Sequence, residues 1–331
     1  MGGGDPAEVT IWGASAGGGS VTAQLIAGGA FDEPPFSAAI AEYPWWQPYI
    51  NETQQDITYR HALELSQCKT TTCLRALPEE QMVVLAQAVL NASYPGPGAV
   101  YGVVVDDKFI LDLPSQEFAC GHFHDVPLIV GHSVNEGSIF VRRNYSPQVM
   151  ATDDAELLFP FAGPAFLSRL YNLYPRAAYD SISNQTVGWF GDFNINCPTY
   201  HTAHNAIDRT SNKSAVWKML FNAGRKRHGA TFEYLNSNYT GLPQASNQTL
   251  GQIMSSYWMS FIMTQDPNVL RMDRAPDWPS YASGGIGTLD TGEAVGFQTL
   301  EVMDDAMEAV VDNDASAKCD FFASRAFQVQ N

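Results

Sequence analysis

A glycine-flanked serine near the start of the chain constrains the fold more than any other feature. The segment Val9–Val21 reads VTIWGASAGGGSV, an apolar run followed by Gly13-Ala14-Ser15-Ala16-Gly17 and by small residues that can open a helix. G-x-S-x-G between a strand and a helix predicts a nucleophile elbow, a sharp turn that presents the serine outward. We expect a side chain at either flanking glycine to collide with neighbouring backbone. A tight structural turn would carry the same letters, so the motif alone leaves both interpretations open.

Apolar runs alternate with helical patterns along the rest of the chain. Short runs typical of buried strands occur at Phe36–Tyr43, Val126–Val130 and Ala215–Asn222. Helical periodicity covers much of Gln55–Val89, Asp153–Thr210 and Leu250–Thr264. Strands that alternate with helices predict an α/β fold with a mostly parallel sheet flanked by helices.

An acid and a base follow the serine in the order that a nucleophile elbow predicts. Val126–Val130 leads into a loop with Glu136, and Ala215–Asn222 leads into a loop with His228. Parallel strands place such loops at one edge of the sheet, where open α/β sheets hold their active sites. We therefore predict that Ser15 is the nucleophile, His228 the general base and Glu136 the acid that orients the imidazole. Taken singly, Glu136 would be a solvated loop carboxylate and His228 a loop histidine among charges.

The other histidines are weaker candidates for the base. His122 and His124 precede the strand at Val126–Val130, so we expect them at the opposite end of the sheet. His132 lies only four residues before Glu136, too close for the usual separate loops. The histidines on helical stretches are interpreted as packing or surface groups: His61, His201 and His204.

Charge and composition exclude several functions. A formal net charge of −17 disfavours nucleic-acid binding, because the protein would repel phosphate. Contents of 45% hydrophobic and 16% charged residues are typical of a globular chain and not of a disordered one. No apolar run approaches the ~18 residues of a membrane span, and no signal peptide is visible. No second pair of cysteines or histidines stands at zinc-ligand spacing, so we expect no metal site.

Two features nevertheless point to a secreted protein. The chain contains seven N-x-[ST] sequons, more than its composition predicts, at Asn51, Asn91, Asn144, Asn184, Asn212, Asn238 and Asn247. The alternative to glycosylation is a set of polar loops rich in asparagine and serine. Five cysteines include Cys68 and Cys73, whose spacing suits a small disulfide loop.

Several ordered segments resemble the successive signatures of the carboxylesterase type B family, which includes carboxylesterases, cholinesterases and related lipases. They read GGDPAEVTIWGASAGG, VPLIVGHSVNEGS, RKRHGATFEYL and YWMSFIMTQDPN with PDWPSY, and the likeness extends to KCDFF near the C-terminus. The resemblance implies an α/β-hydrolase fold, a small-molecule ester substrate and the roles already given to Ser15, Glu136 and His228. It implies no metal or organic cofactor, and it leaves the oligomeric state open.

The resemblance also places the cysteines. It identifies Cys68 and Cys73 as the family's loop disulfide, and it implies a long-range disulfide between Cys197 and Cys319. Cys120 is then left over, and we expect it to be a buried free thiol.

Other positions near the predicted site carry finer expectations. Trp45 and Trp46 follow the second strand, where the family builds part of its acyl pocket, although core packing is an equal alternative. Ala14 stands before the nucleophile where many members carry glutamate. Asn135 stands before the acid where aspartate is common.

Family members carry a long segment before the elbow, with the first strands of the sheet and a glycine-rich loop that donates N–H groups to the oxyanion. We therefore expect residues 1–331 to be the C-terminal portion of a single α/β-hydrolase domain of a secreted protein, with the N-terminal strands missing. The strand at Val9–Trp12 would then be an exposed apolar edge, and the Ala16 N–H would be the evident oxyanion donor. Losing one such donor typically costs about 10²–10³ in rate. The alternatives are an inactive fragment or a non-catalytic binding or adhesion protein, with amide or dipeptide hydrolysis as a minor possibility.

Overall fold

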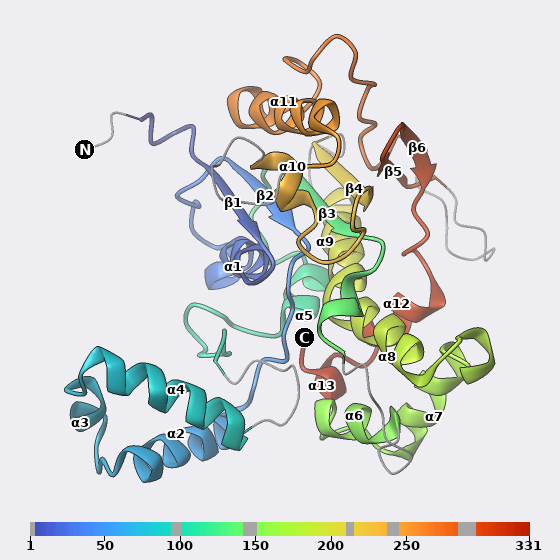
Figure 1. Ribbon diagram of the computed structural model, residues 1–331. Helices are drawn as coiled ribbons and strands as arrows, with labels where there is room; N and C mark the ends of the chain where they lie inside the picture. The colour runs from blue at the N-terminus through green and yellow to red at the C-terminus, as the bar shows by residue number, and fades with distance from the viewer. Residues whose placement is uncertain (1–3, 94–100, 142–150, 210–214, 237–244, 284–295) are drawn as a thin grey trace.

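A six-stranded sheet forms the centre of the computed structural model, which describes residues 4–93, 101–141, 151–209, 215–236, 245–283 and 296–331. Its spatial order follows the chain: β1 (Thr10–Ala14), β2 (Ala38–Glu42), β3 (Leu128–Ser133), β4 (Val216–Asn222), β5 (Gln298–Met303) and β6 (Met307–Val311). The first five strands are parallel, and β6 returns antiparallel to β5 (Figure 1). The mostly parallel sheet expected from the sequence is confirmed, whereas the β5–β6 hairpin was not predicted.

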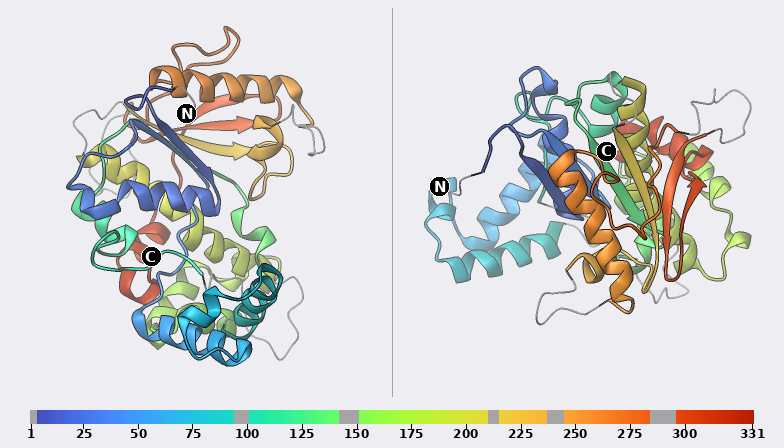
Figure 2. Two further views of the ribbon diagram at one scale, coloured as in Figure 1. Left: turned by 90° about the vertical axis from the view of Figure 1, so that its left-hand side faces the viewer. Right: turned by 90° about the horizontal axis from the view of Figure 1, so that it is seen from above.

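Helices cover both faces of the sheet (Figure 2). Alternate residues of a strand point to opposite faces, so Ala39 and Ala41 of β2 join one apolar cluster while Ala38 and Ile40 join the other. The first cluster is covered by α1 (Ala16–Leu25), α5 (Pro114–Cys120) and α9 (Cys197–Arg209). The second is covered by α10 (Thr231–Leu235) and α11 (Gln248–Thr264).

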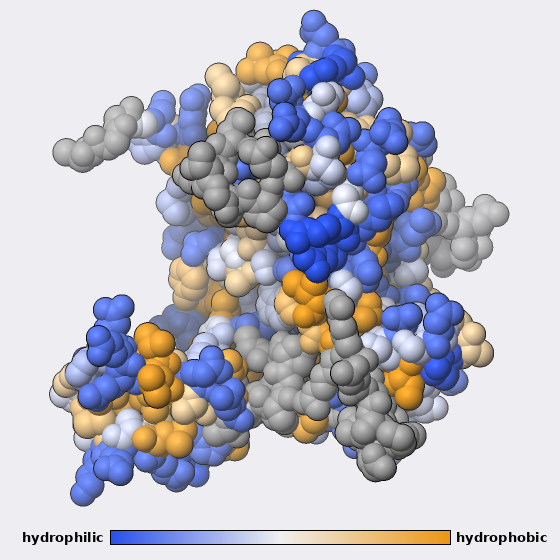
Figure 3. Space-filling view, in the orientation of Figure 1, coloured by the Kyte–Doolittle hydropathy of each residue, from blue (hydrophilic) through white to orange (hydrophobic). Residues whose placement is uncertain are grey.

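The remaining helices lie outside this three-layer arrangement. They are α2 (Glu52–Ser66), α3 (Thr71–Arg75), α4 (Glu79–Ser93), α6 (Ala151–Leu158), α7 (Pro164–Leu173), α8 (Ile182–Gly191), α12 (Ala317–Ala323) and α13 (Ala326–Val329). Figure 1 shows α2–α4 standing apart from the sheet, and Figure 3 shows apolar surface on this projection. Its exposed apolar side chains include Val83 and Val84 of α4. Within the described ranges, no helix combines the length and the apolar character needed to cross a bilayer.

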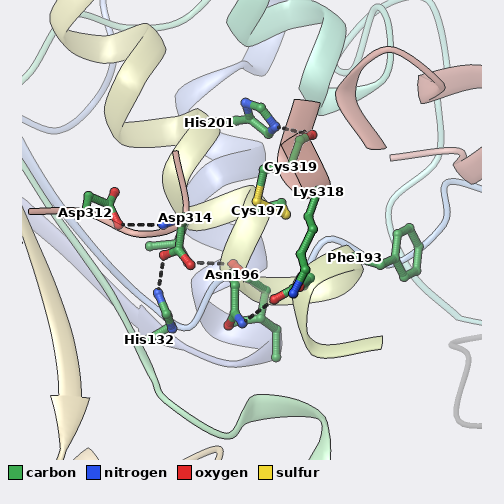
Figure 4. The surroundings of a disulfide bond; sticks show 12 residues. His132, Phe193, Asn196, Cys197, His201, Asp312, Asp314, Lys318 and Cys319 are labelled. Atoms are coloured by element: carbon green, nitrogen blue, oxygen red, sulfur yellow. Dashed lines mark hydrogen bonds and ion pairs between the residues drawn. A yellow bond between two sulfur atoms is a disulfide. The ribbon is translucent and has the colours of Figure 1, made fainter. Parts of the chain in front are cut away.

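Two disulfides join helical segments. One links Cys68 to Cys73 between α2 and α3, and the other links Cys197 of α9 to Cys319 of α12 across 122 residues (Figure 4). These are the pairings that the family resemblance implies. Cys120 is free, but the expectation that it is buried is wrong: it is exposed at the end of α5, whose inward-facing residues include Phe118 instead.

β3 ends later than the sequence pattern indicates. The apolar run stops at Val130, yet the strand continues to Ser133 and includes His132, which is 2% exposed. His132 Nε2 lies 2.6 Å from Asp314 Oδ2, in the segment that follows β6 (Figure 4). His132 is therefore a paired histidine within the sheet and not a loop residue. Burial disfavours its charged form, but Asp314 outweighs burial and raises the pKa of His132.

Candidate active site

The turn between β1 and α1 presents Ser15 in a strained backbone conformation. Its φ is 59° and its ψ is −120°, a region that residues other than glycine rarely adopt. The Ser15 N–H donates to the Glu42 carbonyl oxygen at 3.0 Å, and the Ser15 carbonyl oxygen accepts from the Gly19 N–H at 2.9 Å and the Trp45 N–H at 3.2 Å. The turn is thus hydrogen-bonded to both α1 and the segment after β2. This is the local geometry that the G-x-S-x-G motif predicts.

The two glycines of the motif are not equivalent. A Cβ at Gly13 would lie 2.2 Å from the Gly17 carbonyl oxygen, so the expected collision is confirmed there. A Cβ at Gly17 would meet nothing within 4 Å outside its own helix, so the same expectation is wrong for Gly17. Gly18 and Gly19 are the tightly packed positions instead: a Cβ at Gly18 would lie 2.4 Å from the Glu42 carbonyl oxygen at the end of β2, and one at Gly19 would lie 2.4 Å from the Trp45 carbonyl oxygen.

Ser15, His228 and Glu136 form one hydrogen-bonded chain. His228 Nε2 lies 2.7 Å from Ser15 Oγ, and His228 Nδ1 is hydrogen-bonded to Glu136 Oε2. The other carboxylate oxygen of Glu136 accepts the Ser133 N–H at 2.5 Å. Glu136 is 1% exposed, and the His228 side chain is 6% exposed. With the carboxylate on Nδ1, the neutral imidazole carries its proton there and presents the Nε2 lone pair to the serine.

The acid and histidine loops lie side by side because β3 and β4 are neighbours. Asn135 and Arg227, the residues immediately before Glu136 and His228, form an isolated parallel β-bridge. Glu136 then begins a short 3₁₀ helix, Glu136–Ile139, which packs on α8 so closely that a Cβ at Gly137 would lie 2.2 Å from a backbone oxygen of that helix. The position of Asn135 thus contributes to the site through its backbone.

Aromatic rings surround the histidine. The ring centroids of Tyr43 and Phe140 each lie 4.8 Å from that of His228, and the Trp45 ring lies 6.2 Å away. Trp45 packs on Phe140 at 4.5 Å and on Phe190 at 6.0 Å. Tyr43, Phe140 and Phe190 were not among the residues predicted from the sequence, although Phe140 lies only four residues after Glu136 and could have been found from that spacing.

The two adjacent tryptophans have different environments. Trp45 is half-buried beside His228, whereas Trp46 is 2% exposed. Trp46 stacks on Phe118 of α5 at 5.6 Å, and its Nε1 donates to Thr22 Oγ1 at 3.0 Å. Core packing, the alternative considered for both residues, therefore describes Trp46.

The other sequence candidates lie away from Ser15. His122 and His124 come before β3, beyond the end of the strand opposite to Glu136. His201 and His204 pack within α9, and His201 Nε2 donates to the Cys319 carbonyl oxygen at 3.1 Å (Figure 4). His61 lies on α2. In the part of the chain that the structure describes, no three histidine, cysteine or acidic side chains group as metal ligands would.

Ala16, predicted to be an oxyanion donor, directly follows Ser15. It is the first residue of α1, and an N–H in the first turn of a helix has no acceptor within that helix. The residue is exposed next to Ser15. The positive end of the helix dipole reinforces such a donor.

This fold is that of the α/β-hydrolases. The model of the Carboxylesterase family matches residues 2–298, so the chain belongs to that family. Carboxylesterase patB of Penicillium expansum is 28% identical over 81% of this chain and 48% of its own length. Secreted lipase 1 of Botryotinia fuckeliana is 26% identical over 85% of this chain and 54% of its own length.

A solved structure gives the same fold. The crystal structure of Aspergillus niger EstA aligns with a TM-score of 0.77 at 23% identity, over 99% of this chain and 66% of that one. The chain spans about half the length of the two curated relatives, Carboxylesterase patB and Secreted lipase 1.

Proposed function

We propose that this chain carries the catalytic triad of a serine hydrolase that cleaves carboxylic esters. The observation that carries the proposal is the alignment of Ser15 Oγ, 2.7 Å from His228 Nε2, with Glu136 on the opposite ring nitrogen. Membership of the carboxylesterase family supports an ester as the substrate. The strained elbow supports Ser15 as the reacting hydroxyl, because it holds the side chain clear of the helix.

The geometry supports a two-step reaction. His228 Nε2 takes the Ser15 hydroxyl proton as Oγ bonds to the ester carbonyl carbon. The tetrahedral intermediate then collapses, the bond to the alcohol oxygen breaks, and His228 gives its proton to that oxygen. Water, deprotonated by His228, attacks the acyl-enzyme and releases the carboxylic acid and the Ser15 hydroxyl. Glu136 stabilises the imidazolium that forms in both steps.

Neighbouring groups would bind the two ends of the substrate. The Ala16 N–H would donate to the oxyanion. Trp45, with Phe140 and Phe190, forms an apolar wall beside His228 that suits an acyl chain. Trp46 does not belong to this wall, because its side chain is buried in the core.

Covalent labelling tests the nucleophile. A fluorophosphonate probe should label the unsubstituted chain at Ser15, and Ser15→Ala should abolish labelling while leaving the unfolding temperature unchanged. Ser20→Ala is the matched control, because Ser20 is exposed on α1 and its hydroxyl donates to the Ala16 carbonyl oxygen of the same helix. A folded protein whose Ser15 is not labelled would support a non-catalytic binding protein or an inactive fragment instead.

The extent of the domain and its secretion are also proposals. We infer that residues 1–331 are the C-terminal portion of one secreted α/β-hydrolase domain, since the relatives named above are longer and one of them is named a secreted lipase. The genomic sequence upstream of the Met1 codon tests this directly. An in-frame glycine-rich loop and signal peptide would support it, and a stop codon immediately upstream would contradict it.

We also propose that the protein is glycosylated, and the exposure of each asparagine distinguishes the sequons. Asn51, Asn91 and Asn184 are exposed, whereas Asn247 is half-buried and its Nδ2, the atom that a glycan would occupy, donates to the Asp304 carbonyl oxygen at 2.8 Å. Asn144, Asn212 and Asn238 lie outside the described residues. Enzymatic deglycosylation in heavy-oxygen water should therefore mark the three exposed sites and leave Asn247 unmarked.

A further inference from the structure

Glu42 is a buried carboxylate directly behind the nucleophile. It ends β2, is 2% exposed, and pairs in the sheet with Ala14, the residue before Ser15. Its carbonyl oxygen accepts the Ser15 N–H at 3.0 Å. The backbone of Glu42 therefore already contributes to the elbow, and its side chain is one of the few buried carboxylates that the proposed mechanism does not use.

The two carboxylate oxygens of Glu42 bind the two halves of the site. Oε1 accepts the indole N–H of Trp12 at 2.6 Å, three residues before Ser15 on β1. Oε2 accepts the hydroxyl of Thr231 at 2.6 Å, three residues after His228. One side chain thus connects the strand that carries the nucleophile to the segment that carries the base.

A hydroxyl chain extends this connection to the imidazole. Thr231 Oγ1 also lies 3.0 Å from Tyr43 Oη. Thr231 has one hydroxyl proton, which it donates in its hydrogen bond to Glu42. Tyr43 must therefore be the donor in its hydrogen bond with Thr231. The Tyr43 ring packs edge-on against His228, with centroids 4.8 Å apart. The contact therefore runs from carboxylate to threonine to tyrosine to the base.

We propose that Glu42 is a positioning residue, whose ionised carboxylate holds the Ser15 strand and the His228 segment at their reacting separation. This role rests on the proposed function of the triad. Glu42 touches neither the substrate nor the reacting atoms. It acts through Trp12, Thr231 and Tyr43.

Burying the charge of Glu42 costs stability, and this cost distinguishes a positioning role from a purely structural one. Burial raises the pKa of Glu42 to about 6, and the polar groups of Thr231, Trp12 and Trp258 offset only part of that effect. Among the described residues, no cation pairs with Glu42. Its titratable neighbour is the phenol of Tyr43, whose pKa is raised chiefly by burial, then by Glu42 and, to a smaller extent, by Glu136. A neutral amide of the same shape would avoid the desolvation cost. Retaining a carboxylate here lowers stability, which is expected where activity requires the charge.

Glu42→Gln tests the proposal. Glutamine can accept from Trp12, but its amide nitrogen must donate to Thr231, so the hydroxyl chain to Tyr43 reverses its direction. We expect the rate of fluorophosphonate labelling at Ser15 to fall about ten- to a hundredfold, the range that small misplacements of reacting groups produce. The unfolding temperature at pH 8 should be equal to or higher than that of the unsubstituted protein, because the buried charge is gone.

Glu117→Gln is the matched control. Glu117 on α5 is 4% exposed, and burial raises its pKa, but its partner is His122, at the other end of the sheet from Ser15. Removing that charge should leave the labelling rate unchanged. Thr231→Val should lower the labelling rate as Glu42→Gln does, because it breaks the same link between Glu42 and Tyr43.

A second measurement does not depend on activity. Since the folded protein holds the Glu42 proton more tightly than the unfolded chain, stability should fall as pH rises from about 4.5 to about 6. Glu42→Gln should remove this component of the pH dependence. An unchanged labelling rate in Glu42→Gln, or a loss matched by an equal loss of stability at pH 8, overturns the positioning role alone. No labelling of the unsubstituted, folded chain overturns the proposed function and this role with it.

Discussion

Lys218 Nζ lies 2.6 Å from Asp312 Oδ1, and both side chains are buried. Lys218 is on β4, and Asp312 follows the last strand, so the pair ties the C-terminal segment to the interior of the sheet. Asp314 is 2.5 Å from the same ammonium group and also bonds His132. Two carboxylates are thus balanced by a lysine and, when it is protonated, a histidine. Tyr281 completes the shell by donating to Asp312 Oδ2 at 2.6 Å.

Lys218→Met should destabilise the protein by about 3–5 kcal/mol, because it leaves the buried Asp312 carboxylate without a cation and Asp314 with His132 alone. Urea unfolding at pH 7 measures this. Lys318→Met is the control: Lys318 is 3.9 Å from Asp192 and its side chain is 41% exposed, so its loss should cost less than about 1 kcal/mol. Similar losses from both variants would contradict the balance described for Lys218.

His201 should make stability fall in acid. Burial lowers the pKa of His201 to about 4, so between pH 6.5 and pH 4 the unfolded chain binds a proton that the folded protein does not. The resulting loss is on the order of 3 kcal/mol by pH 4. His201→Gln, whose amide can still donate to the Cys319 carbonyl oxygen, should lack this loss when urea unfolding is compared at pH 7 and pH 4.5. The same decline in both proteins would assign the acid sensitivity to other groups.

The two disulfides should contribute unequally to the stability of the protein. On the chain-entropy account, closing the 122-residue separation of Cys197 and Cys319 stabilises by about 5 kcal/mol, and the five-residue separation of Cys68 and Cys73 by about 2 kcal/mol. The double alanine variant of each pair can be compared by thermal unfolding. Equal losses from the two variants would show that loop length does not govern their effect in this fold.

Gly13→Ala should damage the elbow, and Gly17→Ala should not. The added methyl group at Gly13 would lie 2.2 Å from the Gly17 carbonyl oxygen, so the backbone must move to relieve the clash. The space around a methyl group at Gly17 is open. We expect Gly13→Ala to lose at least tenfold in Ser15 labelling, in line with the sensitivity of reacting groups to small displacements. Gly17→Ala should retain the rate and gain stability by up to about 1 kcal/mol, because it replaces a helical glycine. Equal effects of the two variants would contradict the asymmetry of the turn.

The parts of the fold and site that sequence could predict are those that depend on neighbouring residues or on strand order. Ser15 was found because its turn requires glycine at Gly13, and Glu136 and His228 because each follows an apolar strand. The hydrogen bond between Glu136 and His228 follows from the adjacency of β3 and β4, because a parallel sheet in chain order brings the ends of these two strands together. Their catalytic roles stay a proposal for the labelling experiment to test.

The parts that sequence could not predict depend on distant partners. Lys218 interrupts an apolar strand and is buried only because Asp312 and Asp314 arrive from the end of the chain. From the sequence, Glu42 is simply the last residue of a strand. Its hydrogen bonds reach Trp12, 30 positions earlier, and Thr231, 189 positions later. Trp45 and Trp46 could not be distinguished, because the turn after β2 sends adjacent side chains to the site and to the core.

Ser15, the proposed nucleophile, follows an outer strand of the described sheet. Among the described strands, β1 and β6 each have one hydrogen-bonded neighbour, and Trp12 in the middle of β1 is 46% exposed. An outer strand opens at a lower free energy than the strands enclosed between two others, so amide exchange should be faster at Thr10–Ala14 than in β3 or β4. The lifetime of the turn that presents Ser15 is then governed by local opening of one strand, and a preparation can lose this turn while the rest of the sheet remains folded.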